Sequence, residues 1–408
     1  MRNIAILHYS CPPVVGGVEE VVREQAHLFH RNYHPVKVIA GSGAHFSKDF
    51  DVELNPLIGS RNPEVLDIQK DPAADSRRLE VIADKIYNYL KSTLSKFDVL
   101  IAHNVITMHF NLPLAMAIHR LADNQVIRVV SWNHDSPYFY EDHPVEIDRR
   151  AWSILRDYNP DISYIAISSS RAKEFRRLYG IKEDLTVIPN GIDPVTFFHL
   201  DHSTFRLIME NNLLEADLIF VQPSRLHPRK NIELSIKVIE ALHGLGINAK
   251  LLLTGAYDPH GIDARDYCNK LENLAESLNV EKEIIIIADY TFKSGERMRA
   301  DRIAMRDLYL ISDLLFLPSI QEGFGLPLLE AGMIKLPIAC SDIAPFKDIA
   351  GEDACFFSLD DNPGKIAENV LQFLKGMKPH GMYRNVICNY VWDNIYTHSI
   401  KPFLEGLD

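Results

Sequence analysis

The chain has 408 residues, which is too long for one small hydrophobic core, so two domains are expected. An apolar share of 47% and a charged share of 24% are those of an ordinary soluble globular protein. The net charge of −12 argues against a nucleic-acid partner, which would need a strongly basic face. Five scattered cysteines predict reduced thiols in a cytoplasmic protein, and no apolar stretch approaches the ~20 residues that span a bilayer.

The negative charge is unevenly distributed. Residues 1–195 carry a net charge of −3 and residues 196–408 carry −9. The amino-terminal half is therefore the part that would tolerate peripheral contact with an anionic membrane. A local basic cluster in this half consists of Arg171, Lys173, Arg176 and Arg177. A solvated helix face is the interpretation that we favour for this cluster.

Short apolar runs alternate with helical patterns along the whole chain. The runs predicted as strands are 4–7, 36–40, 99–102, 126–131, 164–167, 187–188, 218–221, 250–254, 284–288, 314–317, 338–340 and 354–357. Between the first two runs, Val18 to Phe29 has apolar residues at helical spacing. Continuous apolar strands alternating with helices predict parallel sheets covered on both faces. Because the series occurs twice, the predicted fold is α/β, with two Rossmann-like, doubly wound parallel-sheet domains.

Turn residues separate the two series. The segment Pro189 to Pro194 reads Pro-Asn-Gly-Ile-Asp-Pro and marks the boundary. We predict a first domain over 1–193 and a second over 194–389. A carboxyl-terminal helix, about 390–408, is predicted to pack back on the first domain. Residues 41–80 lack periodicity and are predicted to form a long loop or excursion.

A paired-carboxylate turn follows the predicted strand 314–317. Glu322 and Glu330 are separated by seven residues around the glycine-rich sequence Gly-Phe-Gly-Leu-Pro-Leu-Leu. Pro327 suits the first position of a helix, and Glu330 is expected in its first turn. Glycine lets the backbone approach a ligand closely, and the unpaired amides of a helix start favour an anion or hydroxyl groups. The pattern therefore predicts a ligand-binding turn instead of a plain solvated loop.

A basic loop follows the predicted strand 218–221. Arg225 and Lys230 lie on either side of this strand-to-helix turn. Arginine offers a planar fork and lysine a point charge, and both suit phosphate oxygens. A basic loop alone is more often a solvated surface. Here, however, the basic loop and the carboxylate turn both lie at strand-to-helix junctions of one predicted sheet. This placement indicates a binding site for a diphosphate beyond the carboxyl ends of the strands.

Together these motifs resemble the retaining nucleotide-sugar glycosyltransferases of the GT-B fold, a large group that includes sucrose synthases and bacterial mannosyltransferases. The resemblance covers nearly the whole chain. It also rests on Gly16-Gly17 after the first strand, on Asn133-His134-Asp135, and on the segment Pro189 to Asp193. It implies two facing Rossmann-like domains. It further implies transfer of a hexose, glucose or mannose, from a nucleotide sugar to a hydroxyl acceptor, with retention of configuration.

The resemblance implies roles for three residues of the first half. Gly16 and Gly17 would let the backbone of the first loop meet the donor diphosphate, although a plain strand-to-helix turn explains two glycines equally well. His134 would contact the donor sugar and help to stabilise positive charge near the anomeric carbon.

For the second half, the resemblance implies that Arg225 and Lys230 neutralise the departing nucleoside diphosphate. Glu322 would bind sugar hydroxyls near the reacting carbon, and Glu330 would hold the ribose hydroxyls. The residues that would contribute backbone contacts beside Glu322 are Gly323, Phe324, Gly325 and Leu326.

The identities of the nucleotide base of the donor and of the acceptor stay open. Where the family often has a glycine before the base-binding loop, residues 284–287 run into Ala288-Asp289-Tyr290, so uracil and guanine remain alternatives. The acceptor is expected to be a small molecule or a glycan. Polar and aromatic residues near the predicted strand ends of the first domain either bind the acceptor or pack in the core. They are His103, Asn104, His109, Trp132, Tyr138, Phe139 and Tyr140.

No metal or other cofactor is expected. Asp49-Phe50-Asp51 superficially matches the Asp-x-Asp element that binds manganese in the other major glycosyltransferase fold, but it lies far in sequence from the predicted diphosphate clamp. Two other functions remain as alternatives: a nucleotide-sugar epimerase or hydrolase on the same fold, and a regulator that binds a sugar nucleotide without turnover.

Overall fold

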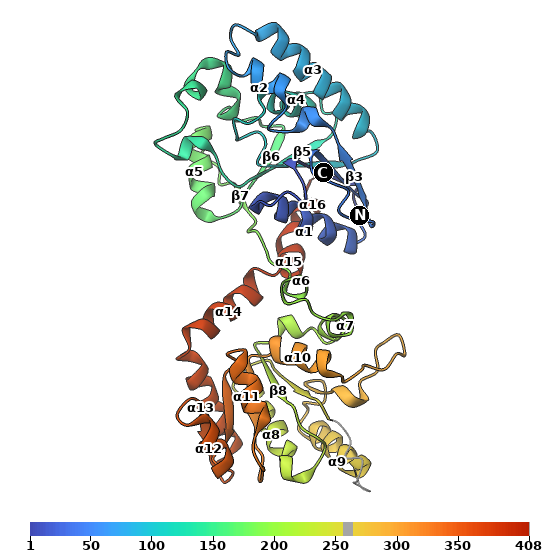
Figure 1. Ribbon diagram of the computed structural model, residues 1–408, viewed down its shortest axis with the longest axis vertical. Helices are drawn as coiled ribbons and strands as arrows, with labels where there is room; N and C mark the ends of the chain where they lie inside the picture. The colour runs from blue at the N-terminus through green and yellow to red at the C-terminus, as the bar shows by residue number, and fades with distance from the viewer. Residues whose placement is uncertain (256–263, 408) are drawn as a thin grey trace. The chain divides into compact units, whose positions relative to one another are not determined.

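The computed structural model describes residues 1–255 and 264–407. The chain divides into two compact units (Figure 1). The first unit comprises Met1–Asp193 and Tyr390–Asp408, and the second comprises Pro194–Asn389.

The first unit is built on a seven-stranded sheet in the order β3-β2-β1-β4-β5-β6-β7, with every neighbouring pair parallel. Its strands are β1 (Ile4–Ser10), β2 (Val36–Ser42), β3 (Asp51–Leu54), β4 (Val99–His103), β5 (Arg128–Asn133), β6 (Ile162–Ala166) and β7 (Thr186–Val187). Its helices are α1 (Gly17–Arg31), α2 (Pro63–Ile68), α3 (Ser76–Thr93), α4 (Leu112–Asp123), α5 (Ser169–Tyr179), α15 (Trp392–Ile395) and α16 (Lys401–Glu405).

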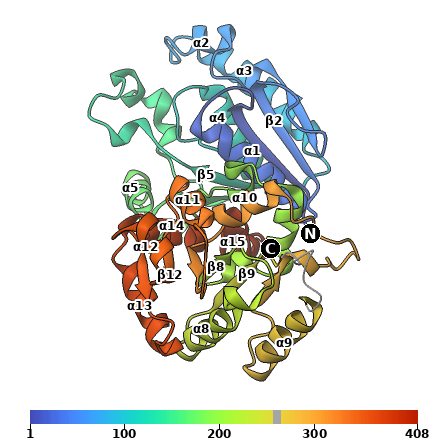
Figure 2. The ribbon, with the colours of Figure 1, turned by 60° about the horizontal axis from the view of Figure 1, so that its bottom comes forward.

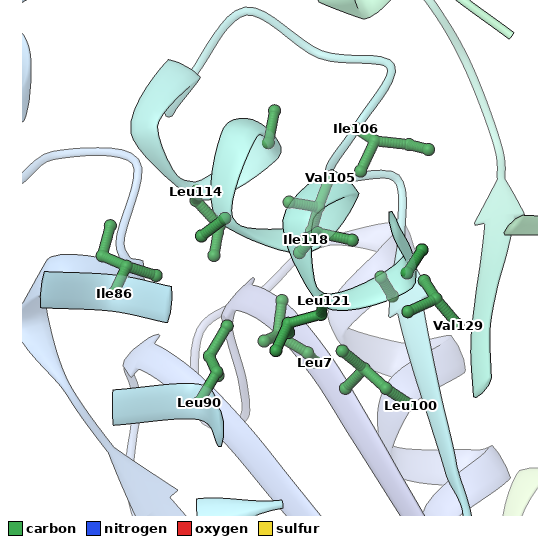
Figure 3. Close-up of a cluster of buried hydrophobic side chains, with 14 of the residues drawn as sticks. Leu7, Ile86, Leu90, Leu100, Val105, Ile106, Leu114, Ile118, Leu121 and Val129 are labelled. Carbon is green, nitrogen blue, oxygen red and sulfur yellow. The ribbon is translucent and has the colours of Figure 1, made fainter. Parts of the chain in front are cut away.

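Helices bury both faces of this sheet. One face packs against α1 and the carboxyl-terminal helices α15 and α16. The other face packs against α2, α3, α4 and α5. Figure 3 shows part of that second layer, where Leu7 and Leu100 of the sheet meet Leu90 of α3 and Leu121 of α4. Burial on both faces explains why the central strands are continuous apolar runs in the sequence.

The second unit has a six-stranded parallel sheet in the order β10-β9-β8-β11-β12-β13. Its strands are β8 (Leu218–Gln222), β9 (Ala249–Leu253), β10 (Ile284–Ile286), β11 (Leu314–Leu317), β12 (Ile338–Ser341) and β13 (Cys355–Phe357). Its helices are α6 (Pro194–Phe198), α7 (His202–Glu210), α8 (Ile232–Gly244), α9 (Ala264–Ser277), α10 (Arg302–Leu310), α11 (Leu326–Met333), α12 (Ala344–Ala350), α13 (Pro363–Lys375) and α14 (Lys378–Asn389).

This second sheet is also covered on both faces. Helices α8, α9 and α13 pack on one face, and α8 and α13 lie side by side in Figure 2. Helices α7, α10, α11 and α12 pack on the other face. Both units are therefore doubly wound parallel sheets, which confirms the predicted fold class.

The prediction of a loop over residues 41–80 is wrong. This stretch contains β3, α2 and the start of α3. In β3, Val52 is buried whereas Asp51 is exposed, and Lys37 of β2 forms ion pairs with Asp51 and Glu53 at 3.0 and 2.8 Å. An edge strand of this kind alternates between buried and exposed residues, so it has no continuous apolar run that would reveal it in the sequence.

Each sheet reverses its strand order at one point. In the first unit the reversal lies between β1 and β4, and in the second between β8 and β11. At such a point the loops that leave the two central strands turn toward opposite faces. Ligands of open α/β sheets bind there, beyond the carboxyl ends of the strands. The predicted functional residues follow these strands and their neighbour β5.

The carboxyl-terminal segment is fixed to the boundary segment within the first unit. The amide of Ile192 donates to the carbonyl of Tyr390 at 2.7 Å, and the amide of Trp392 donates to the carbonyl of Ile192 at 3.2 Å. Trp392 is fully buried, and a Cβ atom on Gly191 would lie 2.7 Å from its ring. Only glycine at position 191 lets these two segments pack this closely.

We expect Gly191→Ala to lower the free energy of unfolding by about 1–3 kcal/mol, because the added methyl group forces the buried Trp392 ring to move. Urea unfolding followed by tryptophan fluorescence measures the change. Gly244→Ala is the control, because a Cβ atom there meets nothing within 4 Å. Equal stability of the two variants would contradict the proposed packing constraint.

Candidate functional site

The paired-carboxylate turn connects β11 to α11 in the second unit. Gly325 caps the helix with φ at 119°, and a Cβ atom there would lie 3.1 Å from Leu328 and Phe346. Glycine is therefore required at this position on both conformational and steric grounds. A Cβ atom on Gly323 would meet nothing within 4 Å, so the backbone of this glycine faces open space.

Two details of the predicted turn are wrong. Helix α11 begins at Leu326, so Pro327 is its second residue instead of its first. Glu330 is the fifth helical residue and lies in the second turn. The side chain of Glu330 accepts a hydrogen bond of 2.6 Å from the hydroxyl of Tyr309, a residue of α10. Tyr309 thus holds the carboxylate to which the family resemblance assigns ribose binding.

An ion pair joins the two predicted motifs of the second unit. The ammonium group of Lys230, in the loop after β8, contacts Oε1 of Glu322, in the loop after β11. Their side chains are only 15% and 14% exposed. Ser319 also donates to Oε1 of Glu322, at 2.8 Å. The structure therefore brings a cation and a carboxylate together at the point where the strand order reverses.

Buried polar residues hold these two loops in place. At the end of β8, Gln222 donates to the carbonyl of Lys230 at 3.0 Å and accepts from Ser235 at 2.6 Å. The amide of Ile320 donates to the carbonyl of Arg229 at 2.8 Å, which ties the loop after β11 to the loop after β8. These bonds fix the backbone on both sides of the ion pair before any ligand binds.

Arg225 lies in the same loop as Lys230, but its environment differs. Its side chain is exposed, whereas Lys230 is largely buried against Glu322. The two residues therefore do not form a symmetric pair in the described structure. A role of Arg225 in diphosphate binding stays a prediction.

In the first unit, the Gly-Gly pair forms the start of α1, after β1. Gly16 caps the helix in an extended conformation, and a Cβ atom there would lie 2.1 Å from the carboxylate of Glu19. That carboxylate accepts a hydrogen bond from Ser10 at the end of β1. A Cβ atom on Gly17 would meet nothing within 4 Å. The backbone at Gly17 is thus open, whereas the carboxylate of Glu19 lies against Gly16. Phosphate binding at this helix start stays a prediction.

His134 follows β5 and is 8% exposed. Its backbone amide and that of Asp135 both donate to Oδ1 of Asn104, at 3.0 and 2.8 Å. Its ring lies in a row of polar groups. Nε2 of His134 is 3.1 Å from Nδ1 of His103, and Nδ1 of His134 is 3.3 Å from Nδ2 of Asn190. Both ring nitrogens of His134 thus have partners inside the first unit.

Burial keeps these imidazoles neutral. Loss of hydration, together with the nearby ring of His8, lowers the pKa of His134 to about 3. Burial also lowers the pKa of His103 well below its usual value, and the rings of His134 and His8 add to the effect. At neutral pH each of these two rings therefore carries one proton and one lone pair.

The other aromatic residues near these strand ends differ in their surroundings: some lie in the core, and others lie beside Asp135 and Arg171. Trp132 is 1% exposed and belongs to the core, stacked on His103. Arg171, by contrast, packs over the ring of Phe139 and pairs with Asp135 at 3.2 Å, and Tyr140 donates to the same carboxylate at 2.9 Å. Arg171 therefore does not belong to a merely solvated helix face, the interpretation that the sequence favoured.

The Asp-x-Asp element lies near the amino ends of the strands of the first sheet, whereas the candidate site residues follow their carboxyl ends. Asp51 is the first residue of β3 and pairs with Lys37, near the amino ends of the strands. Asp49 has a side chain that is 58% exposed and lies 3.9 Å from His27. Within residues 1–255 and 264–407, no group of three or more His, Cys, Asp or Glu side chains could hold a metal ion.

Comparison with known protein families agrees with this geometry. Residues 15–195 match the family model described as glycosyltransferase family 4, and residues 205–387 match that described as glycosyl transferases group 1. The chain belongs to the nucleotide-sugar glycosyltransferases of the GT-B fold. Among the described residues, no helix is long and apolar enough to cross a membrane.

Individual relatives are distant. The chain is 27% identical to the mannosylglucosylglycerate synthase of Petrotoga mobilis over 65% of this chain and 64% of that protein. It is 25% identical to the enzyme of the same name from Thermotoga maritima over 88% of this chain and 85% of that protein. Among solved structures, Anabaena Alr3699/HepE in complex with UDP and glucose matches over 100% of both chains with 17% identity and a TM-score of 0.38.

Several residues of this glycosyltransferase that support the predicted site were not found from the sequence. Gln25, Gln222 and Ser319 each bond to a predicted residue or to its neighbour. Gln25 alone had a detectable signal, because it occupies a buried position on the apolar face of α1, where a polar residue is unusual.

We expect Glu322→Ala and Lys230→Ala each to lower turnover by ~10²-fold or more, as is typical for loss of a preorganised charged contact in the transition state. Arg229→Ala and Gln321→Ala are matched controls, because both side chains are exposed in the same two loops. Steady-state rates and melting temperatures test this. Wild-type rates in either site variant, with unchanged melting, would remove these residues from the active site.

We expect Tyr309→Phe to weaken donor binding by roughly 3–10-fold, the value of one hydrogen bond, while kcat changes little. The substitution keeps the buried ring and removes only the hydroxyl that orients Glu330. Glu330→Ala is expected to act in the same direction and more strongly, because ribose contacts change little during bond breaking. Measurement of KM and kcat over a range of donor concentrations shows whether each variant affects donor binding or turnover. A loss confined to kcat would contradict the ribose assignment.

Proposed function

We propose that this glycosyltransferase is a retaining hexosyltransferase that moves glucose or mannose from UDP-glucose or GDP-mannose to a hydroxyl group of an acceptor. The observation that carries the proposal is the largely buried ion pair between Lys230 and Glu322. Breaking the bond between a sugar and a nucleoside diphosphate places negative charge on the phosphate and positive charge on the sugar. The ion pair supplies one fixed group of each opposite sign, and such preorganised charges typically contribute roughly 3–4 kcal/mol each.

The remaining groups of the second unit have roles that follow from their chemistry. Arg225 and Lys230 neutralise the departing diphosphate. Glu322 and the backbone of residues 323–326 bind sugar hydroxyls, and Glu330, oriented by Tyr309, binds the ribose. In the first unit, the start of α1 offers its amides to the diphosphate.

Retention without an enzyme nucleophile is part of the proposal. A retaining hydrolase places a carboxylate nucleophile opposite its acid. Here Oε1 of Glu322 already binds both Lys230 and Ser319, which suits binding more than attack. The acceptor hydroxyl therefore attacks the face that the nucleotide leaves, and an oxygen of the donor phosphate takes its proton. The anomeric configuration of the product, read by NMR coupling constants, tests this step.

The names of the relatives guide the choice of acceptor. Two of them are mannosylglucosylglycerate synthases, which favours a small glycoside of a hydroxy acid as acceptor and mannose as the transferred sugar. Glucosylglycerate is therefore the first acceptor to test, before sugar phosphates and lipid-linked glycans. None of the five cysteines, all of which lie in the described part of the chain, forms a disulfide, which supports a cytoplasmic location.

A donor screen tests the proposal directly. A ligand that binds the native state raises the melting temperature, so UDP, GDP and ADP sugars are compared by thermal shift. We expect UDP-glucose or GDP-mannose to stabilise the wild-type protein and to stabilise Lys230→Ala much less. Product analysis follows with the donor so identified. Free sugar or an epimer formed without acceptor would favour the hydrolase or epimerase alternative, and binding without any product would favour a regulator.

We further propose that turnover needs no divalent metal, because Arg225 and Lys230 supply the positive charge that a metal otherwise brings to a diphosphate. Activity is expected to survive excess EDTA. The double variant Asp49→Asn, Asp51→Asn is expected to stay active, since Asp51 lies near the amino ends of its sheet. Complete loss of activity in EDTA, restored by manganese or magnesium, would overturn this proposal.

A further inference from the structure

A continuous row of hydrogen-bonding side chains crosses the first unit, from α1 to the boundary segment. Oε1 of Gln25 lies 3.1 Å from Nε2 of His103, and Nδ1 of His103 lies 3.1 Å from Nε2 of His134. Nδ1 of His134 lies 3.3 Å from Nδ2 of Asn190. The row therefore links four residues through three contacts, with a side-chain amide at each end and two histidines between.

The amide at one end determines where both histidines carry their protons. A neutral imidazole has one donor nitrogen and one acceptor nitrogen. Because Oε1 of Gln25 only accepts, Nε2 of His103 donates to it and Nδ1 of His103 accepts. Nε2 of His134 must then donate to His103, which leaves Nδ1 of His134 as an acceptor for the Asn190 amide. The Asn190 end shows the same direction, since its Nδ2 group faces His134.

The two ends of the row differ in strength. Gln25 is 0% exposed and lies on a long helix, so its end is fixed. Asn190 is half-buried, and its contact with His134 is the longest in the row. Oδ1 of Asn190 and Nε2 of Gln25 are both buried without a hydrogen-bond partner among the described residues, so exposure and contact length are what distinguish the two ends. The Asn190 end is therefore the one that a ligand replaces at least cost.

We propose that Gln25 and His103 are positioning residues that hold the proton of His134 on Nε2, so that Nδ1 accepts a hydrogen bond from one hydroxyl of the donor sugar in place of Asn190. The proposal rests on the proposed function, since it needs a sugar at His134. In the free protein, the side-chain amide of Asn190 is the group that donates to Nδ1 of His134.

The groups around the row support this arrangement. Nδ1 of His8 is 2.7 Å from the carbonyl of His103 and donates to it, which holds the backbone of His103. Nε2 of His8 lies 3.8 Å from Glu19. Trp132 stacks on the His103 ring. Within the row itself no charged side chain is bonded to either imidazole among the described residues, so the two amides alone set its direction.

The first test reads the tautomer of His134 without any ligand. Long-range ¹H–¹⁵N NMR of histidine-labelled protein distinguishes a protonated from an unprotonated ring nitrogen. The wild-type protein is expected to show His134 protonated at Nε2 only. Gln25→Met removes the fixed acceptor and is expected to give a mixture of both tautomers at His103 and His134. Protonation of His134 at Nδ1 in the wild type, or an unchanged tautomer in Gln25→Met, would overturn the proposal.

The second test measures the sugar contact. Fluorine cannot donate a hydrogen bond, so donors with one sugar hydroxyl replaced by fluorine are compared, using UDP-glucose or GDP-mannose according to the donor screen. One position is expected to lose about tenfold or more in kcat/KM with the wild-type enzyme, the value of a buried hydrogen bond. The same fluorine is expected to cost little in His103→Leu, where Nε2 of His134 has lost its acceptor. An equal fluorine penalty in both proteins would overturn the proposal.

Two further variants separate positioning from general damage to the fold. His103→Asn keeps an acceptor near the place of Nδ1 and is expected to restore most of the rate that His103→Leu loses. His119→Asn is the control, because His119 is also buried in the same unit, at 7% exposure, and lies 3.3 Å from an asparagine, Asn159, but toward the amino ends of the strands. It is expected to leave kcat/KM unchanged. Equal losses in all three variants would show damage to the fold and contradict a positioning role.

The outcomes also separate this proposal from the proposed function. Failure of the proposed function appears as absence of sugar transfer with every donor, while the tautomer of His134 can still be read. Failure of the positioning role appears as the wrong tautomer, or as an unchanged fluorine penalty, in a protein that transfers sugar normally.

Discussion

Parallel pairing of every strand in both sheets is the constraint on which the rest of the structure depends. It places the carboxyl ends of all strands at one edge of each sheet, and the reversal of strand order leaves two neighbouring loops diverging there. In the second unit these are the loops of Lys230 and Glu322, 92 residues apart in sequence. In the first unit they are the loops after β1 and β4, with His134 directly after the next strand, β5. Groups that lie far apart in sequence are thus brought together by the order of the strands.

The ion pair of the second unit suits the proposed reaction, because each charge compensates the other until the bound donor takes over that role. Two largely buried charges would be costly if either were alone. Paired, the two charges offset each other, and in a largely buried site their effect on a developing charge is larger than in solution. In the proposed reaction Lys230 exchanges the carboxylate for a phosphate oxygen, and Glu322 is released toward the sugar. Ser319 and Gln222 hold the loops during this exchange, so little reorganisation remains for the chemical step.

The sequence predicts those parts of the fold that are buried on both sides. Strands such as Leu314–Leu317 are continuous apolar runs, because helices cover both faces of the sheet. Strand Asp51–Leu54 was missed because an edge strand alternates, and its exposed residues pair with Lys37 instead of packing. The helix after the carboxylate turn was placed one residue late, because the cap is set by Gly325 and its packing against Phe346, which are tertiary facts.

The same distinction applies to the candidate site. The motifs that carry Lys230, Glu322 and His134 are local in sequence and were recognised as such. Their partners were not, because a hydrogen bond between residues 78 positions apart, such as that from His103 to Gln25, depends on which faces of a strand and a helix meet. The only sequence signal for this contact is Gln25 itself, a polar residue at a position of α1 that is otherwise expected to be apolar.

In the proposed reaction, the neutrality of His134 gives the first unit a role different from that of the second. A cationic imidazole beside the sugar would oppose the positive charge that builds near the anomeric carbon. Burial lowers the pKa of His134 to about 3, so no such opposition arises at neutral pH. In the proposed arrangement the lone pair on Nδ1 presents partial negative charge instead, and a sugar hydroxyl that donates to it gains electron density as the reaction proceeds. Amide partners suit this arrangement better than carboxylates, since an acidic residue in place of Gln25 would draw a proton onto His103 and leave His134 without its acceptor.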